Sequence, residues 1–342
     1  MRSFDGYTHG INLGGWLSQC DHDPEHYATF ITEDDFRNIR NYGLDHVRIP
    51  VDYEVISDGS GNLKEEGFKI IDRAYVWCRK YDLNMIFDLH KTYGFSFDFG
   101  ENETGFFDSE EYQEMFYKLW EAISSRYGRC HEHMAFELLN EVTDKEYCDT
   151  WNSIIRKCIS RIRVNAPETY IITGGYYNNS IDAIPDLEKP ADDRVVFTFH
   201  CYEPLIFTHQ GAYWAPGMDT SFRIPLDATY GQMAKASKEY LSQVTVGFDG
   251  FDEDGRLSVE YFDKYFSEAV SVAERLNVPL YCGEYGVINL ADPEETLRWY
   301  GIISEAFDKY RIGRSAWNYK EKDFGLMDDH MSAVREEVMK KL

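Results

Sequence analysis

Short apolar runs rich in β-branched and aromatic residues alternate with longer stretches of helical periodicity along the whole chain. Such alternation is typical of parallel strands joined by crossover helices. The pattern predicts eight strands, which cover His9 to Leu13, Asp45 to Pro50, Asn84 to His90, His133 to Asn140, Tyr170 to Gly174, Val195 to His200, Pro279 to Glu284 and Arg314 to Tyr319.

The stretches between these runs carry helix signals. Asp108 with Glu111, and Asp292-Pro293 with Glu295, place an acceptor and a later glutamate where the free amides of a first helical turn need them. Another stretch repeats apolar residues at helical spacing, and we expect this face to pack on the strands as core: Phe68, Ile71, Tyr75 and Cys78.

Eight strand-helix units without a linker rich in Gly, Pro and Ser favour a closed (β/α)8 TIM barrel, an α/β fold, over residues 1–342. A doubly wound sheet with a second domain is the alternative. The longest irregular segment runs from Glu203 to Leu257, after the sixth strand. Because loops of this length in compact domains are usually functional, we expect an inserted subdomain that borders the substrate cleft.

Charge restricts the partners of this protein. Sixty acidic residues against 35 Lys plus Arg give a net charge of -25, which repels nucleic acid and anionic membranes. The apolar runs are also much shorter than the ~20 residues that cross a bilayer. We therefore expect a soluble protein whose substrate is neutral or is reached locally, and we expect a monomer. The 16% aromatic content suits the apolar faces of sugars, although most of these rings belong to the core.

The N-terminus and the cysteines bear on localisation. The first residues lack the apolar stretch and cleavage site of a signal peptide, although a chain with its signal removed would look the same. Seven cysteines without C-x-x-C pairs argue against a disulfide framework and a structural zinc site. We expect a cytoplasmic protein as the chain stands, or a secreted one if a signal was removed.

Polar residues gather where the predicted strands end. In a barrel of this kind the active site forms at the carboxyl ends of the strands. Two of the endings carry glutamates, Glu141 and Glu284, and either one alone could be a glutamate that starts a helix. Six polar endings together indicate a catalytic mouth: Val47 to Pro50, Asp88 to His90, Leu139 to Glu141, Phe199 to Tyr202, Cys282 to Tyr285 and Ala316 to Tyr319.

Two glutamates suffice for glycosidic cleavage. The reaction needs one carboxylic acid to protonate the leaving oxygen and one carboxylate to attack or support the anomeric carbon. Glu141 and Glu284 can supply both groups.

A series of motifs spans nearly the whole chain and resembles glycoside hydrolase family 5, especially its endoglucanase C-type members. The motifs are Ile11 to Trp16, His46 to Pro50, Phe136 to Glu141, Thr208 to Gln210, Tyr281 to Gly286 and Trp317 to Lys320. The Asn-Glu pair and the later Gly-Glu are specific in combination, although each is short.

The resemblance implies a double displacement with net retention. Glu284 would be the nucleophile and Glu141 the acid/base, with carboxyl groups ~5 to 5.5 Å apart. Arg48 would hold Glu284 ionised, whereas apolar surroundings and the charge of Glu284 would raise the pKa of Glu141. Asn140 would bind the 2-hydroxyl of the sugar.

Further substrate-binding residues follow from the same resemblance. His90, His200 and Tyr202 would bond hydroxyls or orient the nucleophile, and Trp317 would lie under the sugar, although each could instead be structural. Lys91 departs from the family pattern, which has a second histidine here, and this affects the inherited specificity. Three more aromatic residues could stack against sugar rings or could equally be packing residues: Trp16, Trp214 and Phe207.

The expected substrate is a β-1,4-glucan or mixed-linkage β-1,3-1,4-glucan, with no cofactor and no metal. An exo-acting β-glucosidase and a mannan or glucomannan hydrolase are alternatives on the same scaffold. A metal-dependent barrel hydrolase is less favoured because the first strand carries only His9 and no His-x-His pair. A non-catalytic sugar-binding protein would give no reason for Arg48, Asn140, Glu141 and Glu284 to coexist.

Overall fold

Eight parallel strands close into a barrel in the computed structural model, which describes residues 1–98, 101, 103–241 and 247–342. Neighbours in sequence are neighbours in the barrel, and β1 pairs with β8 to close it. This confirms the predicted TIM barrel. The strands are β1 (His9–Asn12), β2 (His46–Asp52), β3 (Asn84–Lys91), β4 (Met134–Glu137), β5 (Ile171–Thr173), β6 (Val195–His200), β7 (Leu280–Tyr285) and β8 (Gly313–Ala316).

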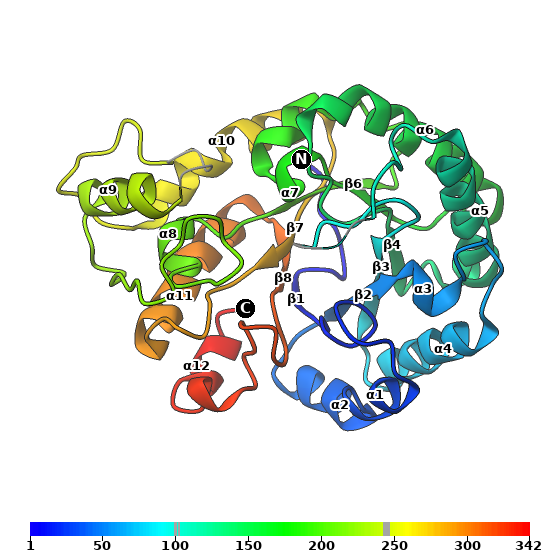
Figure 1. Cartoon of the computed structure of the whole chain (residues 1–342), viewed down its shortest axis with the longest axis horizontal. Coiled ribbons are helices and arrows are strands. Elements are labelled where there is room, and N and C mark those ends of the chain that lie inside the picture. Colours follow the sequence, from blue (N-terminus) through cyan, green and yellow to red (C-terminus); the bar gives the residue numbers. More distant parts are fainter. Residues whose placement is uncertain (99–100, 102, 242–246) are drawn as a thin grey trace.

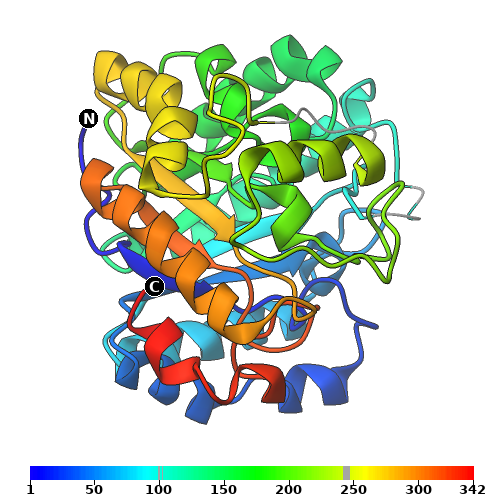
Figure 2. The ribbon, with the colours of Figure 1, turned by 90° about the vertical axis from the view of Figure 1, so that its left-hand side faces the viewer.

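Helices surround the strands (Figures 1 and 2). The α-helices are α1 (Pro24–Thr29), α2 (Glu33–Asn41), α3 (Tyr53–Ile56), α4 (Glu65–Lys80), α5 (Glu110–Tyr127), α6 (Cys148–Asn165), α7 (Tyr176–Asn179), α8 (Leu205–Thr208), α9 (Tyr230–Tyr240), α10 (Val259–Leu276), α11 (Pro293–Tyr310) and α12 (Arg335–Met339). Short 3-10 helices are η1 (Gly128–Cys130), η2 (Lys145–Tyr147), η3 (Ile181–Asp186) and η4 (Asp329–Met331). Within the described ranges, no helix combines the length and the apolarity that crossing a membrane requires.

The hydrophobic pattern explains why these elements pack as they do. Every residue of β2, β6 and β7 is buried, as expected for parallel strands covered on both faces. In α4, Phe68, Ile71 and Cys78 are buried against the barrel as predicted, while Tyr75 is partly exposed. The α11 helix begins where predicted, because the Asp292 side chain accepts hydrogen bonds from the first-turn amides.

Two strands end three residues earlier than the sequence pattern suggests. The prediction ran the fourth strand to Asn140 and the eighth to Tyr319, whereas β4 ends at Glu137 and β8 at Ala316. Beyond β4 the backbone leaves the extended conformation at Glu141, whose φ of 44° is left-handed. The functional residues therefore lie just beyond the strands, in irregular backbone.

The segment from 203 to 257 contains α8 and α9, so it is less irregular than its composition suggests. Its residues 242–246 lie outside the described part. It lies beside α10 and α11 (Figure 1), and an ion pair of 2.6 Å joins Arg298 of α11 to Asp227. Several of its side chains line the cleft described below, but its status as a subdomain stays a prediction.

Candidate active site

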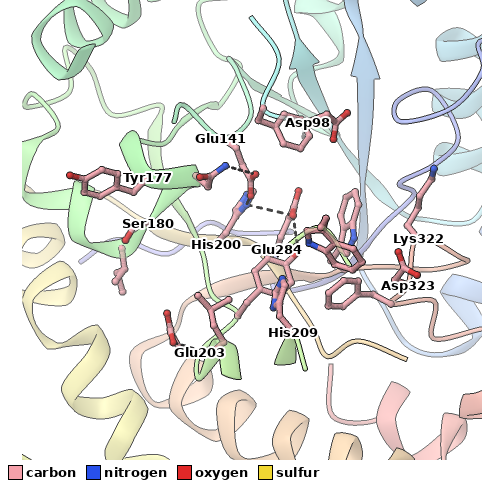
Figure 3. A pocket seen from close by; sticks show the side chains of 18 of the residues that line it. Asp98, Glu141, Tyr177, Ser180, His200, Glu203, His209, Glu284, Lys322 and Asp323 are labelled. Atoms are coloured by element: carbon pink, nitrogen blue, oxygen red, sulfur yellow. Dashed lines mark hydrogen bonds and ion pairs between the residues drawn. The ribbon is translucent and has the colours of Figure 1, made fainter. Parts of the chain in front are cut away.

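A cavity of about 1870 Å³ opens where the strands end. Figure 3 shows Glu141, His200 and Glu284 converging in it, with Tyr177 on one side and Lys322 and Asp323 on the other. Residues from the ends of different strands thus share one cavity, as expected for a catalytic site of this fold.

Glu141 and Glu284 meet in this cavity. A carboxylate oxygen of each, together with a ring nitrogen of His200, lies within 4.8 Å of the others. Glu284 belongs to β7, and Glu141 lies four residues beyond the end of β4. Retaining glycosidases need carboxyl groups about 5 to 5.5 Å apart, whereas inverting enzymes leave a wider gap for water. The spacing fits retention.

Arg48 connects Glu284 with two further acids. Its Nη1 donates to Oε1 of Glu284 over 2.8 Å and its Nε to Oε2 of Glu137 over 2.7 Å, while Nη2 lies 3.0 Å from Oδ2 of Asp88. The guanidinium is fully buried, and Nη2 also donates to Oδ1 of Asn140 over 2.9 Å. Hence a single cation holds three buried carboxyl groups in place.

The electrostatics differ in part from the sequence-based expectation. Burial raises the pKa of Glu141 to about 7, which confirms the predicted direction. Arg48 was expected to keep Glu284 ionised, but burial also raises the pKa of Glu284 to about 7, against the lowering effects of His200 and Arg48. The effect of burial is larger than that of His200 or Arg48, and the charge of Glu141 raises the pKa of Glu284 further.

His200 and Tyr202 hold these two carboxyl groups. The His200 Nδ1 lies 2.7 Å from Oε1 of Glu141 and 3.5 Å from Oε2 of Glu284. Burial lowers the pKa of His200 to about 4, so the ring is neutral, and we place its proton on Nδ1, which faces both acids. The Tyr202 hydroxyl donates to Oε2 of Glu284 over 2.8 Å.

Asn140, His90 and Trp317 complete the predicted set. Asn140 Nδ2 is buried and has no hydrogen-bond partner among the described residues, so the amide keeps a donor for another group. His90 bonds Asp88 through Nδ1 and lies parallel to Trp317, with ring centroids 6.0 Å apart. Both rings line the cavity.

Two of the three other aromatic candidates are corrected by the structure. Trp16 is fully buried, donates its indole N–H to the Tyr27 carbonyl, and does not line the cavity. Phe207 is likewise fully buried in the core. Both rings belong to the main hydrophobic core, where their burial excludes contact with a sugar. Trp214 is partly exposed and does line the cavity.

Sequence reasoning missed several residues of the site. Asp88 and Glu137 were not singled out, although they pair in register across β3 and β4 and alternate with apolar neighbours. An inward-facing acid at period two along a barrel strand was the available signal. Tyr177 and Asn178, which line the cavity after β5, left no comparable signal because turn residues follow no periodicity.

Two groups of side chains in the described ranges are close enough to hold a metal ion: Glu141 with His200 and Glu284, and His22 with Asp52 and Glu54. In the first group the Arg48 charge already neutralises Glu284, which disfavours a second cation. The second group lies near Lys91, whose Nζ is 2.6 Å from Asp98, 2.8 Å from Glu101 and 3.8 Å from Asp52.

Comparison with known proteins decides the family. The family model described as Cellulase (glycosyl hydrolase family 5) matches residues 5–323. The chain belongs to glycosyl hydrolase family 5. This family 5 glycosidase is 47% identical over 309 residues to Cellodextrinase A of Ruminococcus flavefaciens, covering 90% of this chain and 84% of the relative. It is 35% identical over 334 residues to Endoglucanase C of Acetivibrio thermocellus, covering 96% of each.

Solved structures agree with this family 5 fold. Endoglucanase Cel5A of Thermotoga maritima matches with a TM-score of 0.77 at 24% identity, covering 98% of this chain and 97% of that one. The cellulose synthase subunit Z of Clostridioides difficile matches with a TM-score of 0.76 at 26% identity, covering 98% and 99%. The likeness to Cel5A supports the barrel alone.

Proposed function

We propose that this family 5 enzyme hydrolyses β-1,4-glucan or mixed-linkage β-glucan chains and their oligosaccharides by double displacement, with Glu284 as nucleophile and Glu141 as acid/base. The observation that carries the proposal is the meeting of these two carboxyl groups within 4.8 Å in an open cavity. The names of the relatives, a cellodextrinase and an endoglucanase, support a glucan substrate.

In the first step, ionised Glu284 attacks the anomeric carbon and forms a glycosyl-enzyme. The bond to the glycosidic oxygen breaks, and the proton of Glu141 passes to that oxygen. Arg48 and Tyr202 hold the two oxygens of Glu284, which orients the nucleophile before attack. Asn140 retains an amide donor for the 2-hydroxyl of the bound sugar.

In the second step, ionised Glu141 takes a proton from water. The resulting hydroxyl group bonds to the anomeric carbon, and Glu284 leaves as a carboxylate, so the product has the configuration of the substrate. Two inversions at one carbon give net retention. His200, neutral and bonded to Glu141, keeps this carboxyl group oriented through both steps.

The walls of the cavity support a neutral sugar chain as the substrate. Tyr213 is 76% exposed and Tyr177 55% exposed, and both line the cavity together with Trp214 and Trp317. Exposed rings in a cleft suit the apolar faces of pyranose sugars.

Product analysis tests the proposal. The purified protein is incubated with cellooligosaccharides, mixed-linkage β-glucan and mannan, and the products are separated by chromatography. We expect short glucan oligosaccharides from the first two substrates and little release from mannan. Preferential cleavage of mannan, or release of glucose alone from chain ends, would contradict the proposed substrate or mode of attack.

A further inference from the structure

The short α7 segment (Tyr176–Asn179) after β5, called the turn below because its backbone is largely left-handed, contacts the proposed acid/base. Asn178 donates from Nδ2 to Oε2 of Glu141 over 3.1 Å, while the other oxygen, Oε1, faces Nδ1 of His200 at 2.7 Å. The two oxygens of the carboxyl group are thus held by different elements. Figure 3 shows Glu141 beside His200, with Tyr177 to the left of both.

Backbone hydrogen bonds attach this turn to the segment that follows Glu141. Tyr177, Asn178 and Asn179 have φ values of 53°, 57° and 55°, a left-handed run that non-glycine residues rarely adopt. The amides of Tyr177 and Asn178 donate over 3.0 Å to the carbonyls of Thr143 and Val142. Since those carbonyls directly follow Glu141, the turn is fixed to the acid/base segment.

Asn179 extends this contact to His200. Its Nδ2 lies 3.4 Å from Nε2 of His200, so it can donate to the ring nitrogen that carries no proton. With Nε2 as acceptor, Nδ1 keeps its proton and donates toward Glu141. The turn therefore reaches Glu141 directly through Asn178 and indirectly through Asn179.

We propose that Asn178 is a positioning residue for the reaction: its side-chain amide orients the Glu141 carboxyl group toward the glycosidic oxygen. The proposal rests on the proposed function of Glu141. A donor on a carboxyl oxygen also stabilises its ionised form, so the Asn178 bond lowers the pKa of Glu141 against burial, which raises it to about 7.

Other charged or titratable groups face Glu141 from every side, and they stay in place when only Asn178 is changed. Arg48 lowers the pKa of Glu141, whereas Asp98 and Glu137 raise it. The remaining groups are His200 of β6, Tyr202 directly after β6, and Glu284 of β7.

Asn178→Gly is the sharpest test because glycine accepts the left-handed backbone without strain and removes only the donor. We expect the basic limb of the pH profile of kcat/KM to move upward by about one pH unit. Hydrolysis of cellotetraose should fall about tenfold, whereas a dinitrophenyl cellobioside, which needs no acid for departure of its leaving group, should lose much less in its first step. Asn178→Asp, which replaces the donor by a charge, should move the limb further upward.

Asn277→Gly is the matched control. Asn277 is an exposed, left-handed asparagine that ends α10, and its replacement should leave both the pH limb and the substrate ratio unchanged. An unmoved basic limb in Asn178→Gly, or an equal loss on both substrates with an unchanged Tm, would overturn the positioning role. Glu141→Ala, assayed in parallel, tests the proposed function separately: full activity there would refute Glu141 as the acid/base, whatever Asn178→Gly does.

Discussion

The two proposed catalytic carboxyl groups lie within 4.8 Å of each other but are held by different parts of the molecule. Glu284 belongs to β7 and bonds Arg48 of β2, which in turn bonds Glu137 of β4. Glu141 lies beyond β4 in left-handed backbone and bonds Asn178 of a turn. Glu284 is therefore a strand residue held by Arg48 of another strand and by Tyr202 beyond β6, whereas Glu141 lies outside the strands and is held by His200 of β6 and by Asn178 of a connecting segment.

This difference matches the tasks of the two groups. The nucleophile must meet the anomeric carbon in a fixed direction, and packed strands supply that rigidity. The acid/base must give up a proton in one step and take one in the next, so its surroundings must suit both states. Side chains from segments outside the ladder can supply such surroundings without disturbing the barrel.

The largest expected loss of activity follows from replacing Glu284. Glu284→Gln keeps the volume of the side chain and its contact with Arg48 but removes the attacking carboxylate. We expect kcat on cellooligosaccharides to fall by at least about 10⁴-fold, with an unchanged circular dichroism spectrum. Activity within tenfold of the wild type would refute the assignment.

Replacement of Glu141 should lower activity less than replacement of Glu284, and azide should restore part of the lost activity. Glu141→Ala should lower kcat/KM on cellooligosaccharides by about 10² to 10⁴-fold, the usual contribution of a general acid/base. With a dinitrophenyl glycoside, azide should restore turnover, because this substrate needs no acid in the first step. The product, identified by NMR, should be the β-glycosyl azide; the α anomer would contradict retention.

Glu284 and Glu141 also show how much of the site could be predicted from the sequence. Strand periodicity and the strand-end residues predicted the barrel, and Glu284 lies on β7 as expected. Glu141 was predicted to follow the fourth strand directly, but β4 ends four residues before it, and its left-handed backbone was not predicted because such a residue leaves no mark in a hydrophobic pattern. Asn178 was missed for the same reason, since its contact depends on the backbone of a turn.

The aromatic candidates show a related limit. Trp16 and Phe207 looked as suitable for sugar stacking as Trp214, yet the first two are fully buried. Residue type alone cannot separate a ring that packs inward from one that lines a cleft. The raised pKa of Glu284 was missed because its main cause is burial, which a short motif does not reveal.

A smaller effect concerns stability. Burial raises the pKa of Glu141 from 4.5 to about 7, so the folded protein keeps a proton that the unfolded chain releases between these values. Stability is therefore lost as the pH rises through this window. Glu141→Gln should stabilise the protein by about 2 kcal/mol at pH ~8 and by little at pH ~4.

Thermal melts at the two pH values measure this difference. Glu274→Gln, at an exposed position of α10, is the control and should change Tm little at either pH. Equal stabilisation by Glu141→Gln at both pH values would show that burial of the charged carboxylate is not the cause.

The smallest effect concerns the cleft wall. Trp214 lines the cavity from the segment after β6, where it contacts the edge of His209. Trp214→Ala should lower kcat/KM on a five-sugar chain about fivefold, roughly 1 kcal/mol, and change that on a single-sugar aryl glycoside little. An equal loss on both substrates would indicate structural damage instead of a lost sugar contact.

Trapping of the glycosyl-enzyme tests the central claim most directly. A 2-deoxy-2-fluoro cellobioside with a dinitrophenyl leaving group should react once and remain bound, because the fluorine slows both steps whereas the activated leaving group speeds only the first. Mass spectrometry of the intact protein should show one added fluorocellobiosyl group, and the digest should place it on Glu284. An adduct on another residue, or an α-configured product released by the wild-type protein, would contradict double displacement by Glu284.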